Sequence, residues 1–255
     1  MFEIIICIIA GLGAGFGTGF AGMSAAAVIS PLLITFLHMD PYLAVGIALA
    51  SDVLASAASA ITYGKNKNLD IKNGLIMMIS VLCFTMAGSY IASIVPKTTM
   101  GNFSVFMTLL LGIKFIVKPV TEPKQRLLAA TAKQKAIRSV ACGAAVGFIC
   151  GFVGAGGGMM MLLVLTSVLG YELKTAVGTS VFIMSATALT GSVSHFVIGG
   201  MPDVKALVIC VVSTLVFAQI ASLLANKLPA KTLNRITGAI LVVLGVAVLG
   251  VNYLT

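Results

Sequence analysis

Asp52 is the residue whose position in the sequence most strongly suggests a chemical role. It lies near the middle of an apolar run from about 42 to 63, in the segment "GIALASDVLASAASA". Placing a carboxylate at the centre of a membrane helix costs about 2.5–3.5 kcal/mol, and such residues usually face a cavity or a partner. We therefore expect Asp52 to serve in proton coupling or gating, or to make a structural hydrogen bond with Ser51, Ser56 or a neighbouring helix.

Two adjacent hydroxyl residues, Thr179 and Ser180, follow the segment Ala176-Val177-Gly178 near the start of another apolar run. Hydroxyl groups can donate hydrogen bonds to the oxygen atoms of a small anion. Ser and Thr are also common packing residues in membrane helices. The pair is therefore a candidate anion contact, with helix packing as the alternative.

His195 closes the apolar run from 175 to 198. A histidine that titrates near neutral pH can relay protons, and a histidine at a membrane interface can equally be structural. The five cysteines all lie inside apolar runs and form no CxxC pair, so we expect neither disulfides nor a thiolate metal site. The chain has no HExxH, GxSxG or Walker motif, which argues against an enzyme or an ATP-driven pump, and no cofactor is expected.

A glycine-rich stretch, "GFVGAGGGMMM" at residues 151–161, interrupts a long apolar run. Some of its glycines continue a helical stripe that starts at Gly143, and small-residue stripes pack membrane helices closely. Gly156 and Gly157 lie off that stripe, and each glycine costs a helix about 1 kcal/mol, so we expect a helix break. A helix that restarts there offers free N–H groups to an anion. The candidate contacts are Gly154, Gly156 and Gly157, and opposite them Gly22 and Ser24 of the first half.

The composition indicates which kind of secondary structure positions these residues. Of the 255 residues, 59% are hydrophobic and only 9% are charged, and the mean hydropathy is +1.13. These values are typical of an all-α integral membrane protein. Eight apolar runs cover about 4–37, 42–63, 73–95, 100–117, 139–169, 175–198, 204–226 and 232–253. The net charge is +9, and the basic residues lie mostly between these runs, where they set the orientation in the membrane. We therefore expect membrane lipid, and not nucleic acid, as the partner.

The chain repeats itself at an offset of 132 residues. This offset brings Gly11, Gly15, Gly19 and Gly22 onto Gly143, Gly147, Gly151 and Gly154. We predict two homologous four-segment repeats, residues 1–117 and 139–255, joined by a basic cytoplasmic linker at 118–138. Repeats of this kind are typical of secondary transporters, whose substrate sites lie where the repeats meet.

Two different numbers of membrane crossings per repeat are compatible with the apolar runs. Four crossings each place ten Lys and Arg residues on one side and five on the other. If the glycine-broken first run of each repeat is re-entrant, three crossings remain, the repeats become inverted, and the distribution is thirteen against two. The positive-inside rule favours the second solution, with both termini outside and the linker in the cytoplasm.

Three segments of the second half carry a family resemblance: "GFVGAGGGMMMLLVL", "TAVGTSVFIMSATALTGSVSHFVIGGMPD" and "LPAKTLNRITGAILVVLG". They resemble the sulfite exporter TauE/SafE permeases. The first half follows the same plan in "GFGTGFAGMSAAAVISPLL", with Met23 to Ala26 where the family has several glycines. The resemblance implies export of sulfite or an organosulfonate across the cell membrane by a multi-pass permease. An anion channel and a carrier for another small organic anion are the alternatives, and a homo-oligomer stays open.

Overall fold

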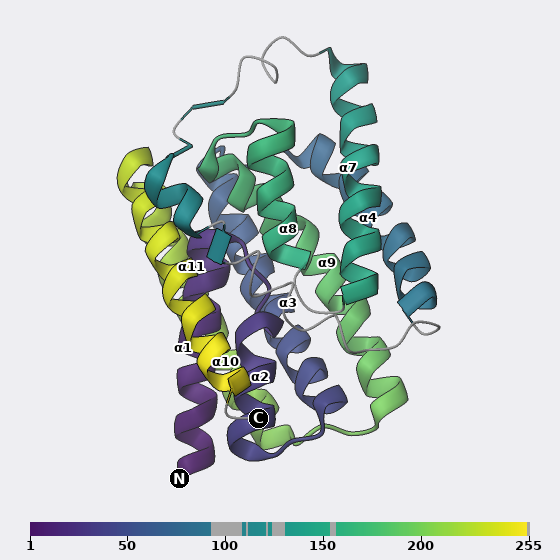
Figure 1. Cartoon of the computed structure of the whole chain (residues 1–255), viewed down its shortest axis with the longest axis vertical. Helices are drawn as coiled ribbons and strands as arrows, with labels where there is room; N and C mark the ends of the chain where they lie inside the picture. Colours follow the sequence, from purple (N-terminus) through teal and green to yellow (C-terminus); the bar gives the residue numbers. More distant parts are fainter. Residues whose placement is uncertain (93–108, 111, 121, 124–130, 154–156, 254–255) are drawn as a thin grey trace.

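The computed structural model describes residues 1–92, 109–110, 112–120, 122–123, 131–153 and 157–253 (Figure 1). Every regular element in these ranges is a helix. The helices are α1 (Phe2–Ala21), α2 (Ala26–Leu37), α3 (Pro41–Lys65), α4 (Ile71–Ala92), α7 (Ala132–Val153), α8 (Gly157–Leu163), a π-helical segment (Val164–Leu169), α9 (Leu173–Gly199), α10 (Val204–Lys227) and α11 (Ala230–Tyr253). The described part of the chain is therefore all-helical, as its composition predicts.

The long helices begin at recognisable capping residues. The Asp40 side chain accepts from the backbone N–H groups of Tyr42 and Leu43, and Pro41 occupies the first turn of α3. Asp203 caps α10 in the same way, through the N–H groups of the second and third residues of that helix. An aspartate at the N-cap satisfies backbone donors that have no partner within the helix. These short polar loops thus fix where two membrane helices start.

The first apolar run is interrupted, and α2 folds back along α1. Gly22 ends α1 in the left-handed conformation, with φ at 60°, which glycine adopts without steric cost. An added Cβ on Gly13 would lie 3.2 Å from Val28, one turn into α2. Helices α1 and α2 therefore form a helical hairpin, with residues 22–25 at its tip.

Glycines allow two helix pairs to pack closely. A Cβ on Gly15 of α1 would come within 2.7–2.8 Å of Phe217, Ala218 and Thr214 of α10. A Cβ on Gly143 of α7 would come within 2.8–2.9 Å of Met77 and Ser80 of α4. Small residues let helix backbones approach in this way in membranes. Helix α1 thus packs along α10 of the second half, and α7 packs along α4 of the first (Figure 1).

Helices α3 and α9 pack against each other in opposite directions. Gly46, near the start of α3, meets Phe196 and His195 near the end of α9. Gly178, near the start of α9, meets Tyr63 near the end of α3. Low residue numbers of one helix therefore lie beside high residue numbers of the other, and this antiparallel pair joins the two halves of the chain (Figure 1).

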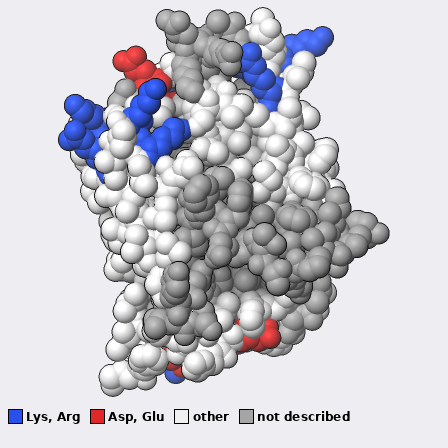
Figure 2. Space-filling model, in the orientation of Figure 1, with Lys and Arg blue, Asp and Glu red and all other residues white. Residues whose placement is uncertain are grey.

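Five described helices are long and apolar enough to cross a membrane: Phe2–Ala21, Pro41–Lys65, Leu173–Val197, Val204–Lys227 and Ala230–Ala247. Figure 2 shows that the Lys and Arg side chains visible on this face gather mainly at the upper end of the molecule. The opposite end carries Lys205, whose Nζ atom lies 3.6 Å from Oε2 of Glu3. The basic end includes Lys65 and Lys67 at the end of α3 and Lys227 at the end of α10. Apolar helices between a basic end and a weakly charged end are the arrangement of a multi-pass membrane protein.

Candidate functional site

The tip of the α1–α2 hairpin is held by hydroxyl groups from three other helices. The last carbonyls of a helix have no partner within it, and in a membrane each must be paired inside the protein. Tyr63 of α3 donates to the Gly19 carbonyl at 2.8 Å, and Thr237 of α11 donates to the Phe20 carbonyl at 3.1 Å. Ser180 of α9 donates to the carbonyl of Gly22 at 2.9 Å. The broken backbone is thus satisfied by side chains from both halves.

Asp52 lies at the other side of this tip, against the start of α2. Its Oδ2 accepts from the backbone N–H of Ala25 at 3.2 Å, and its Oδ1 accepts from the Ser56 hydroxyl at 2.6 Å. The Ser24 hydroxyl accepts from the Ala26 N–H at 3.3 Å. Asp52 and Ser24 therefore cap α2 together, and the carboxylate is fully buried. A negative charge at a helix N-terminus is favourable because the helix dipole is positive there.

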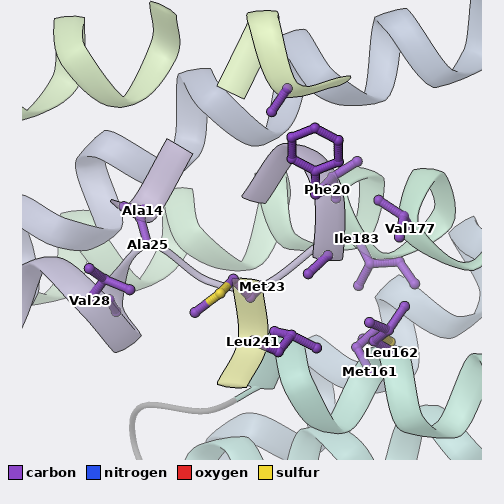
Figure 3. Close-up of a cluster of buried hydrophobic side chains, with 14 of the residues drawn as sticks. Ala14, Phe20, Met23, Ala25, Val28, Met161, Leu162, Val177, Ile183 and Leu241 are labelled. Carbon is purple, nitrogen blue, oxygen red and sulfur yellow. The ribbon is translucent and has the colours of Figure 1, made fainter. Parts of the chain in front are cut away.

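The second break reaches the same point. Gly158, near the start of α8, is buried, and an added Cβ would lie 2.5 Å from the Ser24 nitrogen and 2.8 Å from the Met184 sulfur. The interrupted segments of the two halves are thus in contact. Met23 at the tip of the first break shares one buried cluster with Met161 and Leu162 of α8 (Figure 3).

The adjacent side chains of Thr179 and Ser180 bond to different parts of the protein. Ser180 contacts the tip of the α1–α2 hairpin, whereas the Thr179 hydroxyl accepts from the backbone N–H of Asp70 at 3.2 Å. Tyr171 donates to the Asp70 carboxylate at 2.8 Å, and burial raises the pKa of Tyr171, with a further contribution from Asp70. Thr179 therefore belongs to a polar cluster at the basic end of the molecule, separate from the helix breaks.

His195 lies apart from Asp52. Its Nδ1 is 3.0 Å from the Tyr42 carbonyl oxygen, and its ring stacks on the Tyr42 ring with centroids 4.1 Å apart. Tyr42 and Asp52 are ten residues apart on α3, which is about 15 Å along a helix. The two residues expected to relay or couple protons therefore sit at different depths.

Of the remaining predicted substrate contacts, the structure describes only some. Gly157 begins α8, and Gly154 and Gly156 lie outside the described residues. Among the described residues, no group of three or more His, Cys, Asp and Glu side chains could hold a metal ion. The five cysteines, all within the described ranges, are free thiols.

Two residues that hold the break had no functional reading in the sequence. Tyr63 aligns with His195 at the 132-residue offset, which was the one available signal that its position matters. Thr237 resembles any other threonine in a membrane helix, and no sequence signal marks it. Both act on residues far along the chain, at separations of 44 and 217 positions.

Comparison with known proteins gives a consistent result. The chain is 27% identical over 95% of its length to the probable membrane transporter protein YunE of Bacillus subtilis, of which it covers 96%. It is 23% identical over 83% of its length to the probable membrane transporter protein YdhB of the same organism, with 86% of that protein covered. A third relative is the probable membrane transporter protein MJ0441 of Methanocaldococcus jannaschii, with 26% identity over 75% of this chain and 70% of the relative.

The family match extends over most of the sequence. The sequence model of the sulfite exporter TauE/SafE family matches residues 7–248, which include both helix breaks and the helices that hold them. The relatives are named as transporters and not as enzymes. The chain therefore belongs to the sulfite exporter TauE/SafE family and is a multi-pass membrane transporter.

Proposed function

We propose that this chain is a secondary transporter of the cell membrane that exports a small sulfur-containing anion such as sulfite or an organosulfonate, with coupling to protons through Asp52. The observation that carries the proposal is the contact between Gly158 and Ser24, which brings the broken segments of the two halves together beside a buried carboxylate. Transporters commonly bind substrate and coupling ion where such segments meet.

The substrate contacts in this proposal are Gly22, Ser24 and Ser180 at the first break and Gly154, Gly156 and Gly157 at the second. The geometry favours Ser180 over Thr179, because Ser180 already contacts the break and Thr179 bonds to Asp70. His195 is retained only as a gating residue at the end of α9, where it stacks on Tyr42.

In this proposal, the proton affects anion binding by neutralising the Asp52 carboxylate beside the helix breaks. An ionised Asp52 repels an anion next to Ser24, and protonation removes this repulsion. Binding of the proton and of the anion are then mutually favourable, as any two linked ligands must be. The anion should bind more tightly as the pH falls, and the gradients across the membrane set the direction of flux.

We further propose that residues 1–117 and 139–255 are inverted repeats whose first helices are re-entrant. The antiparallel packing of α3 on α9 supports this, because these helices align at the 132-residue offset. A two-fold axis perpendicular to both helices would relate them. The return of α2 along α1 supports the re-entrant element, and the basic end supports a cytoplasmic position for the linker at 118–138.

A thermal-shift screen of the purified protein tests the substrate. Sulfite, sulfate, thiosulfate, taurine, sulfoacetate and chloride are compared at several pH values, since a ligand of the folded state raises its Tm. A selective shift with one sulfur anion, larger at low pH, is the expected result. A selective shift with a carboxylate and none with sulfur anions would instead indicate a carrier for another organic anion.

Flux into proteoliposomes then distinguishes carrier from channel. A carrier shows saturation and counterflow of labelled substrate, whereas a channel shows electrogenic flux without saturation. Gly158→Ala should abolish counterflow, because its Cβ would meet backbone atoms of Ser24 and Met23. The matched control is Gly191→Ala on α9, whose Cβ would meet only the flexible end of Leu49. Normal counterflow in Gly158→Ala would show that the contact between the breaks is not needed for transport.

A further inference from the structure

Asp52 is the first member of a polar stripe along α3. Ser56, Ser59, Tyr63 and Asn66 follow it at four, seven, eleven and fourteen residues, which is the spacing of one helix face. Asp52, Ser56, Ser59 and Tyr63 have no exposed surface. Asn66, which follows the last turn, is exposed at the basic end. The stripe therefore connects a buried carboxylate with the aqueous phase about 21 Å away.

The stripe runs in one direction only. On the opposite side of Asp52, toward the start of α3, the buried side chains include Ala44, Ile47 and Ala48. Ser51 is buried there too, and its hydroxyl donates to the Ile47 carbonyl of the same helix at 2.8 Å. The polar face thus begins at Asp52 and continues solely toward the basic end.

The corresponding face of α9 lacks these polar groups. At the 132-residue offset, Asp52, Ser56 and Ser59 align with Met184, Ala188 and Gly191. Those three residues carry no hydroxyl or carboxyl group, and Met184 lies beside Gly158 of α8 as Asp52 lies beside Ala25 at the start of α2. The polar side chains are therefore a property of one half, and the equivalent position of the other half is packed without a carboxylate.

Ser59 is the central member of the stripe, and its hydroxyl has an unusual environment. Its Oγ is buried and has no hydrogen-bond partner among the described residues. Buried hydroxyls are normally paired with protein or with water. Hydroxyls one helical turn apart are separated by about 5–6 Å between Cβ atoms, a gap that one water molecule can bridge with two hydrogen bonds. Ser59 lies one turn from Ser56 on one side and one turn from Thr62 on the other.

The path continues from Thr62 to the aqueous end. Thr62 lies beside the stripe, and its Oγ1 accepts from the Gln219 amide of α10 at 3.0 Å. The Asn66 amide donates to the Thr62 carbonyl at 2.8 Å, so Asn66 marks the exposed end of the stripe, and water carries the proton from there to the Thr62 hydroxyl. Donors and acceptors thus extend from Ser59 to the exposed end of α3, with contributions from two helices.

We infer that this stripe is a proton path that connects Asp52 to the aqueous phase at the basic end of the molecule. The inference rests on the proposed coupling role of Asp52. A hydronium ion at Asn66 gives up one proton, each water or hydroxyl along the stripe accepts one and passes one on, and an O–H bond forms on the Asp52 carboxylate. Among the residues that the structure describes, the groups that interact with this carboxylate are Ser56, Ser24 and the Ala25 N–H, and none is charged.

The test measures the protonation of Asp52 directly. After a pH jump on the protein in nanodiscs, time-resolved infrared spectroscopy follows the carboxylic acid C=O band that Asp52→Asn removes. Ser59→Val should slow the appearance of this band about tenfold, because a hydroxyl relay is replaced by an apolar group. The substitution breaks no hydrogen bond to a described residue, so the fold should persist.

Ser51→Val is the matched control, since Ser51 is equally buried on the same helix but lies outside the stripe. Slowing in Ser59→Val and not in Ser51→Val supports the path. Equal rates in both variants and the parent overturn it, as does the lack of any band that Asp52→Asn removes.

The proposed function fails on a different measurement. Proton-driven flux that is unchanged in Asp52→Asn contradicts the coupling role, whatever the infrared rates are. Substrate counterflow needs no net proton movement, so Ser59→Val should retain it if the path is the only function lost. Loss of both counterflow and the infrared band in Ser59→Val would indicate a collapsed site and overturn the inference.

Discussion

The structure gives Asp52 the structural hydrogen bonds that the sequence allowed, and proton coupling is the role that we propose for it in addition. Its carboxylate accepts the Ala25 N–H and thereby caps α2, and the Ser56 hydroxyl provides a second bond. A capping carboxylate is structural, but its place at the contact between the two breaks also makes it the acid best placed to respond to a bound anion. Substitution with asparagine separates these roles, because an amide oxygen still accepts hydrogen bonds and cannot gain a proton.

We predict that Asp52→Asn folds with a Tm close to that of the parent and loses pH-driven flux. Asp52→Ala should lose the cap as well, at a cost of about 0.5–2 kcal/mol. Thermal unfolding and proteoliposome flux with and without a pH gradient measure the two effects. A large loss of Tm in Asp52→Asn would assign this residue to the fold alone.

Tyr63 is the residue whose loss should weaken the break most directly. Tyr63→Phe leaves the Gly19 carbonyl without its hydroxyl donor, and an unpaired buried acceptor costs about 1–3 kcal/mol. A lower Tm is the expected outcome. Tyr42→Phe serves as the control, because the Tyr42 ring is partly exposed at the opposite end of α3. Equal stabilities of the two variants would argue against this role for the Tyr63 hydroxyl.

At the scale of elements, the glycines separate into two kinds. One kind lets a helix of one half lie against a helix of the other, namely Gly11, Gly15 and Gly19 on α1 and Gly143 and Gly147 on α7, while Gly22 and Gly158 serve the breaks themselves. From the sequence alone, close packing was expected of the glycines on the helical stripe, and a helix break was expected at Gly156 and Gly157, which lie off it. The structure assigns packing to Gly15 and Gly143 and a conformational role to Gly22, whose φ is positive.

We predict that Gly15→Ala destabilises the α1–α10 pair by about 1–3 kcal/mol, because its Cβ would collide with backbone atoms that cannot move aside. Gly64→Ala on α3 should be neutral or slightly stabilising, since its nearest neighbour is a Leu69 methyl group at 3.4 Å and alanine favours helix. Thermal unfolding of both variants in detergent measures the difference. Equal Tm values would show that the α1–α10 pair tolerates a wider spacing.

At the scale of the whole molecule, charge and topology make one prediction. The basic end should face the cytoplasm. In a background without cysteine, Lys67→Cys at the basic end should react with an impermeant maleimide only after cells are permeabilised. Met201→Cys, at the opposite end and 86% exposed, should react in intact cells. The reverse pattern would contradict the proposed orientation and place the linker outside.

The sequence by itself determined most of the secondary structure. Apolar runs predicted helices, and the short polar segments between them predicted their ends, as the observed bounds of α3 (Pro41–Lys65) and α10 (Val204–Lys227) confirm. The break near Gly22 was also predictable, because glycine and capping preferences act within a few residues. These features depend on local chemistry, and hydropathy reports local chemistry well.

Only the tertiary structure decided which groups complete the site. Tyr63 and Thr237 pair with carbonyls of α1, Ser180 reaches Gly22, and Thr179 turns instead to Asp70. Adjacent hydroxyls point about 100° apart around a helix, so their partners depend on which helices pack on either side. A stripe of small residues shows that a helix packs closely and does not name its partner. The packing of α1 on α10 and of α7 on α4 supplied that information.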